Sequence, residues 1–288
     1  MFDNRITEDQ PRSYIVIDIE SAVLDESGHR RYQQMERWVP SRDSDKSRRG
    51  YKRSEDPLKT PRWVFQTITT AAAMVLVEHQ DGNLEVARFV TLGAPEHDER
   101  AVVAGLLDVL ADAPTGAAIA SWAGSFHDVS LIVMAAMKHG LTLPKGWGWL
   151  AFGGQHRTRH VDFARIVTGG LKMKPIHMAE VAAALDIPAK LTIPPFAVAG
   201  LIEAGAWAAV ASAVEVDCIS TALLLARWRK LFDDRAEVQV VQDRILRQIE
   251  ALRPNRPYIP ALRAHRAAGL NAIVANDVTI PWVTGYAA

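Results

Sequence analysis

The sequence predicts an α/β fold in which a mixed sheet of five to six strands carries helices on both faces. The first observation is a run of β-branched residues at 13–21, which is typical of a strand buried in the middle of a sheet. The second is a pair of apolar segments joined by Asp81-Gly82-Asn83, which favours the turn of an antiparallel hairpin. The third is the alternation of short strands with amphipathic helices after residue 95.

The composition is that of an ordinary globular protein, because 49% of the 288 residues are hydrophobic and 23% are charged. The 33 Lys and Arg residues balance the 33 Asp and Glu residues, so any contact with nucleic acid must come from a local patch. The single cysteine, Cys218, lies in an apolar helical run, where we expect a buried filler. We expect a cytoplasmic protein without a membrane span, since one cysteine fits a reducing compartment and no apolar segment has the required length.

The elements follow in order from the hydrophobic pattern, with strands read from alternation and helices from a 3.6-residue period. After the first strand we expect strands at 63–78, 84–92, 117–122 and 160–163, and helices at 96–111, 126–139, 178–185, from 198 onward, at 211–228 and at 233–253. We expect one domain over residues 13–232. Residues 233–288 should form a C-terminal helix and a tail, rich in Pro and Ala, that caps the same domain.

A charged, turn-rich and aperiodic insertion occupies about residues 25–61, as in a long loop. Its basic side chains surround Tyr51, and they could bind phosphates while the ring stacks on a base. These basic residues are Arg48, Arg49, Lys52 and Arg53. The alternative is a solvated insertion, because acids such as Asp43 and Glu55 dilute the positive charge.

A second loop, at 143–159, is rich in glycine, tryptophan and basic residues. Trp147 and Trp149 lie close in the sequence to Arg157 and Arg159, and this combination could stack on bases and hold phosphates. Tryptophans that pin the loop onto the domain would explain the same residues equally well. Both interpretations stay open at this point.

Two carboxylates, Asp18 and Glu20, come at the end of the first strand. Strand side chains alternate between faces, so these two acids point to the same face. Two like charges on a buried strand are costly unless a cation compensates them or one carboxyl stays protonated. Hard divalent ions take oxygen ligands of this kind, although a strand end that reaches solvent would carry the same pair.

Two further acids occur in contexts that could bring them to the same place. Asp128 lies in the first turn of a helix that follows a short strand, close to the sheet edge where α/β proteins build their sites, although a first-turn Asp also simply suits the helix dipole. Asp217 lies in an apolar helical run among Val214, Val216 and Cys218, so it requires a cation or a basic partner. Glu215 is rotated away from that face, and we expect it on the surface.

These four acids are the strongest chemical signal in the sequence. No zinc signature, Gly-rich phosphate loop or serine nucleophile elbow competes with them. A cluster made only of carboxylates is the ligand set for a pair of hard metal ions, which together promote in-line phosphoryl displacement. Hydrolysis of phosphodiesters is therefore the predicted reaction class.

The order of these motifs resembles the ribonuclease H-like 3′–5′ exonucleases of the DEDD superfamily. More closely, it is similar to the predicted exonucleases related to the proofreading domain of family-B DNA polymerases. The resemblance extends over residues 13–231 and rests on five stretches: 16–20, 121–128 with 137–140, 160–163, 185–190, and 203–205 with 215–218. It implies a ribonuclease H-like fold and activity on nucleic acid, with single-stranded 3′ ends as the expected substrate.

The resemblance also implies roles for individual residues. Asp18, Glu20, Asp128 and Asp217 would be the catalytic acids and would bind two Mg²⁺ or Mn²⁺ ions. Asp162 would be a supporting acid.

The chain departs from the family pattern beside the last acid. Members of this superfamily carry a Tyr four residues before it or a His five residues before it, whereas this chain has Ala213 and Ser212. His127, His156 and His160 are the nearest candidates for a substitute base, although a His beside an acid is more often a structural partner.

Two functions from different classes follow. The first is a metal-dependent 3′–5′ exonuclease acting on DNA, or on RNA. The second is a catalytically weak or inactive relative that uses the same groove to bind nucleic acid or to assemble with other proteins. Intact acids favour the first function, and the missing Tyr or His favours the second.

Overall fold

The structure is a computed structural model that describes residues 12–23, 25, 27–28, 31, 63–154, 156, 158–170, 172–174 and 176–274. Most of the predicted insertion at 25–61 lies outside the described residues, and so does Arg157. The nucleic-acid contacts predicted for this insertion, at Arg48, Arg49, Lys52 and Arg53, therefore lie outside them as well.

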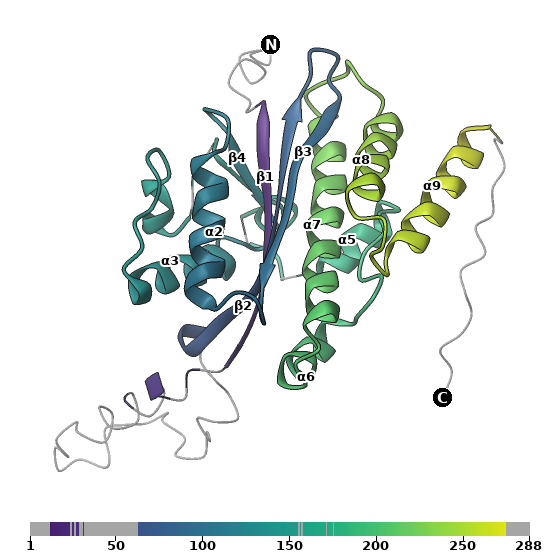
Figure 1. Ribbon diagram of the computed structural model, residues 1–288. Helices are drawn as coiled ribbons and strands as arrows, with labels where there is room; N and C mark the ends of the chain where they lie inside the picture. The colour runs from purple at the N-terminus through teal and green to yellow at the C-terminus, as the bar shows by residue number, and fades with distance from the viewer. Residues whose placement is uncertain are drawn as a thin grey trace.

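A mixed five-stranded sheet in the order β3-β2-β1-β4-β5 forms the centre of the molecule (Figure 1). β1 is antiparallel to β2 and parallel to β4, β2 is antiparallel to β3, and β4 is parallel to β5. The strands are β1 (Ser13–Val23), β2 (Gln66–Glu78), β3 (Leu84–Gly93), β4 (Ala118–Ser121) and β5 (His160–Asp162). The sheet confirms the predicted α/β fold, with the first strand in its interior.

Helices cover both faces of the sheet, with α2 and α3 on one side and α7 and α8 on the other (Figure 1). The α-helices are α2 (Glu99–Ala111), α3 (Asp128–His139), α4 (Phe163–Val167), α5 (Met178–Ala184), α6 (Val198–Glu203), α7 (Trp207–Arg229), α8 (Val238–Leu252) and α9 (Ile259–Val274). Short 3₁₀ turns occur at η2 (Trp63–Phe65), η3 (Gly148–Phe152) and η4 (Pro195–Ala197). The tail that the sequence presented only as a cap thus contains the helix α9.

The alternation of β1 divides the core into two clusters. Ile15, Ile17 and Ile19 face α2 and α3, while Tyr14 and Val16 face α7 and α8. Asp18 and Glu20 continue the second row by the same period of two, so they point toward α7. The alternation of β1 therefore decides which helix can supply a further acid.

The expectation that no apolar segment is long enough to span a membrane is wrong for α7, which passes that test by length and composition, with a mean hydropathy of 1.7 over its best window. In this fold 83% of that window is buried against the rest of the protein, including the sheet. Such burial is what a core helix requires, because a helix that is apolar all round must be covered on all sides. The apolar composition of α7 is therefore explained by its place in the core.

The expectation that Glu215 lies on the surface is wrong, because its side chain in α7 is completely buried. It accepts hydrogen bonds from Arg256 at 2.6 Å and from Tyr258 at 2.8 Å, and it also pairs with the hydroxyl of Thr91. The position that is rotated away from Asp217 faces β3 and the segment between α8 and α9 instead of solvent. These contacts attach the C-terminal part of the chain to the centre of the domain.

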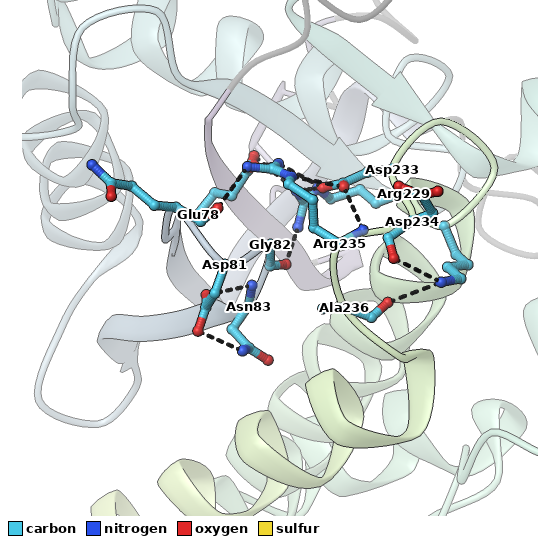
Figure 2. Close-up of polar contacts among 11 residues, drawn as sticks. Glu78, Asp81, Gly82, Asn83, Arg229, Asp233, Asp234, Arg235 and Ala236 are labelled. Carbon is cyan, nitrogen blue, oxygen red and sulfur yellow. Dashed lines mark hydrogen bonds and ion pairs between the residues drawn. The ribbon is translucent and has the colours of Figure 1, made fainter.

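An ion-pair cluster lies at the end of the sheet where β1 begins. It holds the β2–β3 turn against the segment between α7 and α8 (Figure 2). Glu78 and Asp233 each accept from both Arg229 and Arg235, and Arg229 also donates to the carbonyl of Gly82. Since each charge has a partner of opposite sign, this cluster is structural. It fixes the hairpin beside β1, far from the acids at the other end of that strand.

Candidate metal centre

Three parallel strands, β1, β4 and β5, end at the same edge of the sheet, and the predicted acids gather there. Asp18 and Glu20 come from β1, and Asp162 is the last residue of β5. Asp128 begins α3, a few residues beyond the end of β4. The carboxyl ends of parallel strands form the edge where α/β sheets place their sites, and this sheet follows that rule.

Helix α7 brings the last acid over β1. The Sγ atom of Cys218 lies 3.4 Å from the carbonyl oxygen of Ala72 and 3.8 Å from that of Val16, so this turn of α7 packs directly on the strands. Carboxylate oxygens of Asp18, Glu20 and Asp217 consequently lie within 4.8 Å of one another. The small buried cysteine permits this close approach, which confirms its expected role as a filler.

The acids disturb one another electrostatically. Burial raises the pKa of Asp18 well above its usual value, and the charges of Asp217, Asp128 and Glu20 raise it further. Burial and Asp217 raise the pKa of Glu20 to about 7. Burial also raises the pKa values of Asp128 and Asp217. The four carboxyl groups therefore form one interacting cluster that holds protons more tightly than isolated acids do.

The cluster includes a cation, Lys190, that was not predicted from the sequence to be a site residue. Lys190 donates from Nζ to Oδ2 of Asp217 in a close ion pair. Although burial lowers the pKa of Lys190, its pairing with Asp217 and the nearby Asp18 and Glu20 produce a net rise. Lys190 has a positive φ of 52°, so the backbone turns sharply where the side chain enters the site. Its loop lies 27 residues before Asp217, and hydrophobic periodicity gave no signal for the contact.

A chain of hydrogen bonds orients Asp128. His127 contacts Oδ1 of Asp128 through Nδ1 at 3.2 Å and Oε1 of Gln66 through Nε2 at 3.1 Å. The same Gln66 oxygen accepts from the hydroxyl of Ser21 at 2.8 Å. An amide oxygen can only accept, so Nε2 of His127 carries a proton in this arrangement. The imidazole is thereby held between β2 and the carboxylate of Asp128.

Asp162 supports the loop that carries Asp128. Its carboxylate accepts from the backbone N–H groups of Ala123 and Ser125, both at 3.0 Å, and from the hydroxyl of Ser125 at 2.5 Å. His160 is held on both sides, by Ser121 at Nε2 and by the carbonyl of Gly154 at Nδ1. Burial lowers the pKa of His160, which favours the neutral ring. Both ring nitrogens of His160 are thus used in packing, which leaves none for a water molecule.

The fit of this site to a hard metal ion can be judged from its donors. Oδ1 of Asp217 is buried and has no hydrogen-bond partner among the described residues, as expected for an atom reserved for a ligand. The donors are all carboxylate oxygens, which suit Mg²⁺ and Mn²⁺. The three nearest acids approach closely enough to share an ion. The residues present therefore fit a divalent metal site.

The amino-acid sequence of the chain matches a known protein family. Residues 61–258 match the predicted 3′–5′ exonucleases related to the exonuclease domain of PolB. The chain belongs to this family. The matched range includes Asp128 and Asp217 but begins after β1. The place of Asp18 and Glu20 in the site is therefore seen in the structure and not in the family match. No curated protein sequence matches the chain significantly.

Two solved structures resemble this exonuclease-family chain at low similarity. One is the family B DNA polymerase from the hyperthermophilic archaeon Pyrobaculum calidifontis, with 17% identity, a TM-score of 0.44, and coverage of 84% of this chain and 29% of the polymerase. The other is exonuclease I in complex with the inhibitor BCBP, with 11% identity, a TM-score of 0.40, and coverage of 84% and 46%. The chain thus spans less than half the length of either protein.

The Tyr or His that the superfamily resemblance leads us to expect before Asp217 is absent, and no substitute comes from the same turn of α7. Ser212 donates its hydroxyl to the carbonyl of Ala208 at 2.9 Å, and Ala213 offers no polar group. Nδ1 of His156 accepts from the backbone N–H groups of Thr158 and Arg159. Of the histidines considered as bases, only His127 contacts a carboxylate of the cluster.

Arg159, predicted to bind nucleic acid, instead lies at the opposite edge of the sheet. It precedes β5, donates to the carbonyls of Ala117 and Gly146, and stacks on Trp147 with its guanidinium carbon 4.5 Å from the ring centroid. Trp147 is only 4% exposed. For this loop the packing interpretation is therefore the one that agrees with the structure.

Proposed function

We propose that this protein is a metal-dependent 3′–5′ exonuclease that hydrolyses terminal phosphodiesters of DNA, or of RNA. The observation that carries the proposal is the all-carboxylate cluster at the carboxyl ends of β1 and β4, in a chain that belongs to an exonuclease family. The alternative of an inactive relative has less support, because the acids remain crowded at an electrostatic cost that bound divalent ions would relieve.

Asp18, Glu20, Asp128 and Asp217 would hold two Mg²⁺ or Mn²⁺ ions. When bound, such ions supply Lewis-acid chemistry that activates water and stabilises the charge of the displaced oxygen. His127 and Gln66 hold the carboxylate of Asp128 in one orientation, which pre-organises a ligand before an ion arrives. Asp162 does the same for the loop in front of α3.

Lys190 supplies a fixed positive charge beside the acids. A phosphate that approaches the cluster would meet this ammonium as the charge on its oxygens grows, which is the requirement for electrostatic stabilisation of a transition state. No side chain in the described part of α7 serves as a base at the positions of the family's Tyr or His. We therefore propose that the attacking water is activated without a protein base from α7, and that turnover is correspondingly slow, since such a base contributes about 10²–10⁴-fold.

The substrate end is proposed to be a single-stranded 3′ terminus. Exposed aromatic side chains belong to segments that adjoin the acid-bearing edge: Trp63 in η2 is 42% exposed, Phe126 before α3 is 41% exposed and Phe196 in η4 is 87% exposed. Aromatic rings of this kind stack on unpaired bases, whereas paired bases in a duplex present no free face.

The test is digestion of single strands labelled at the 5′ end, in Mn²⁺ and in EDTA. The proposal predicts a ladder that shortens from the 3′ end in Mn²⁺, no digestion in EDTA, and no digestion by Asp217→Asn. Asp112→Asn is the matched control, because the side chain of Asp112 is 71% exposed and lies outside the site. Absence of a ladder with the wild-type protein, or an unchanged ladder with Asp217→Asn, would disprove the proposal.

A further inference from the structure

A basic segment without acids follows β5 at the edge of the sheet where the carboxylates gather. β5 ends at Asp162, and α4 begins with the next residue, so Arg165 lies within one helical turn of that edge. Asp162 also binds the loop at 123–125, which connects this segment to the residues in front of Asp128. The segment is therefore continuous with the acid cluster.

The charge of this segment is one-sided. Residues 163–179 contain Arg165, Lys172 and Lys174 but no Asp or Glu. In the part of the chain that the structure describes, no carboxylate forms an ion pair with any of these three cations. Elsewhere basic side chains are commonly neutralised, as Lys190 is by Asp217 and Arg229 is by Glu78. Basic side chains without a carboxylate partner leave a local positive field, which attracts anions such as phosphates.

Exposed apolar groups lie beside these cations. The guanidinium carbon of Arg165 is 5.7 Å from the centroid of the Phe126 ring, and that ring is 41% exposed. Met173, between the two lysines, is 57% exposed. Cations interleaved with exposed rings and thioethers are what a single strand of nucleic acid requires, because phosphates need charge and unpaired bases need an apolar face.

We propose that Phe126, Arg165, Lys172 and Lys174 form the surface that binds the single strand on the 5′ side of the scissile phosphate. This inference rests on the proposed exonuclease function, and it states where the rest of the substrate leaves the site. The loop that leads to η4 is less suited, since its Phe196 is exposed but its basic residue, Lys190, is already paired.

Binding is measured by fluorescence anisotropy of a labelled single-stranded oligonucleotide in EDTA, so that no cleavage occurs. The triple variant R165A/K172A/K174A should raise the dissociation constant at least tenfold at low salt. It should also make the slope of log K against log salt shallower by about 2, because each phosphate contact on a single strand contributes about 0.7. The control is Lys145→Ala, since Lys145 is an exposed lysine next to Gly146, the Arg159 contact at the opposite edge of the sheet.

A second measurement compares Mn²⁺-dependent cleavage of an oligonucleotide with that of a dinucleotide. The triple variant should lose cleavage of the oligonucleotide while it retains that of the dinucleotide, which is too short to reach the basic segment. Unchanged binding and an unchanged salt slope would overturn the inference, even if the wild-type protein digests DNA. Weakened binding in a protein that never digests DNA would support the basic surface and reject the exonuclease proposal.

Discussion

Replacing Glu20 with Gln should stabilise the metal-free protein, although it removes a proposed ligand. Glutamine keeps the shape of the side chain and removes a charge that the other acids oppose. Burial and the charge of Asp217 raise the pKa of Glu20 from 4.5 to about 7. At about 1.4 kcal/mol for each pKa unit, full ionisation of this group costs about 3 kcal/mol of folding free energy. Because Glu20 is partly exposed, solvent screening reduces the expected gain to about 1–3 kcal/mol.

The sign of the pH dependence follows from the raised pKa. The folded state binds this proton more tightly than the unfolded state, so the favourable contribution is present below pH 4.5 and is lost as the pH rises through 7. The penalty is therefore largest in alkaline, metal-free solution. Glu20→Gln should raise the free energy of unfolding at pH 8 in EDTA, and the gain over wild type should shrink toward pH 5.

The assay is urea unfolding at both pH values, in EDTA and in Mn²⁺. Wild-type protein should gain stability from Mn²⁺ at pH 8, whereas Glu20→Gln should gain much less because a ligand is missing. Glu237→Gln is the control, since the Glu237 side chain is 73% exposed and pairs with Lys230, which follows α7 outside the site. If Glu20→Gln is no more stable than wild type at pH 8 in EDTA, the view of the site as a strained carboxylate cluster is refuted.

Three further predictions concern Lys190, the buried Glu215 and the binding of Mn²⁺. Lys190→Gln should lower the rate of Mn²⁺-dependent digestion by roughly 10²-fold, because it removes a cation that would stabilise the charge developing on the phosphate. A normal rate would exclude Lys190 from catalysis. Tyr258→Phe should destabilise the fold by about 1–3 kcal/mol in urea unfolding, because it removes a hydrogen bond to the buried charge of Glu215; an unchanged midpoint would show that this contact is dispensable. Raising Mn²⁺ should move the acidic limb of the pH–rate profile to lower pH, since ions displace protons from carboxyl groups whose pKa values are raised, and a fixed limb would argue against these ligands.

Much of the fold could be predicted from local pattern. The β-branched run at 13–21 identified the interior strand β1, and the Asp-Gly turn identified the neighbouring β2–β3 hairpin. The period of two along β1 correctly placed Asp18 and Glu20 on one face. The position of Asp217 within an apolar run of a long helix also indicated that it has a charged partner. These features are local, so hydrophobic periodicity and steric preference determine them.

Other features depend on contacts between distant segments, and the sequence pattern did not reveal them. Glu215 is buried because Thr91, Arg256 and Tyr258 converge on it from different elements. Lys190 reaches Asp217 from a loop with a positive φ, and Arg159 is turned inward by carbonyl acceptors on two segments. The substitution of Ala213 and Ser212 for the family's Tyr or His was visible in the sequence, and the structure adds that no polar group from this turn of α7 replaces them.

The most direct test of the central claim is anomalous diffraction at the manganese edge from crystals grown with Mn²⁺. We expect two peaks about 3.5–4 Å apart, ligated by Asp18, Glu20, Asp128 and Asp217. Absence of manganese from this cluster at saturating Mn²⁺, or peaks bound only elsewhere on the protein, would contradict that claim.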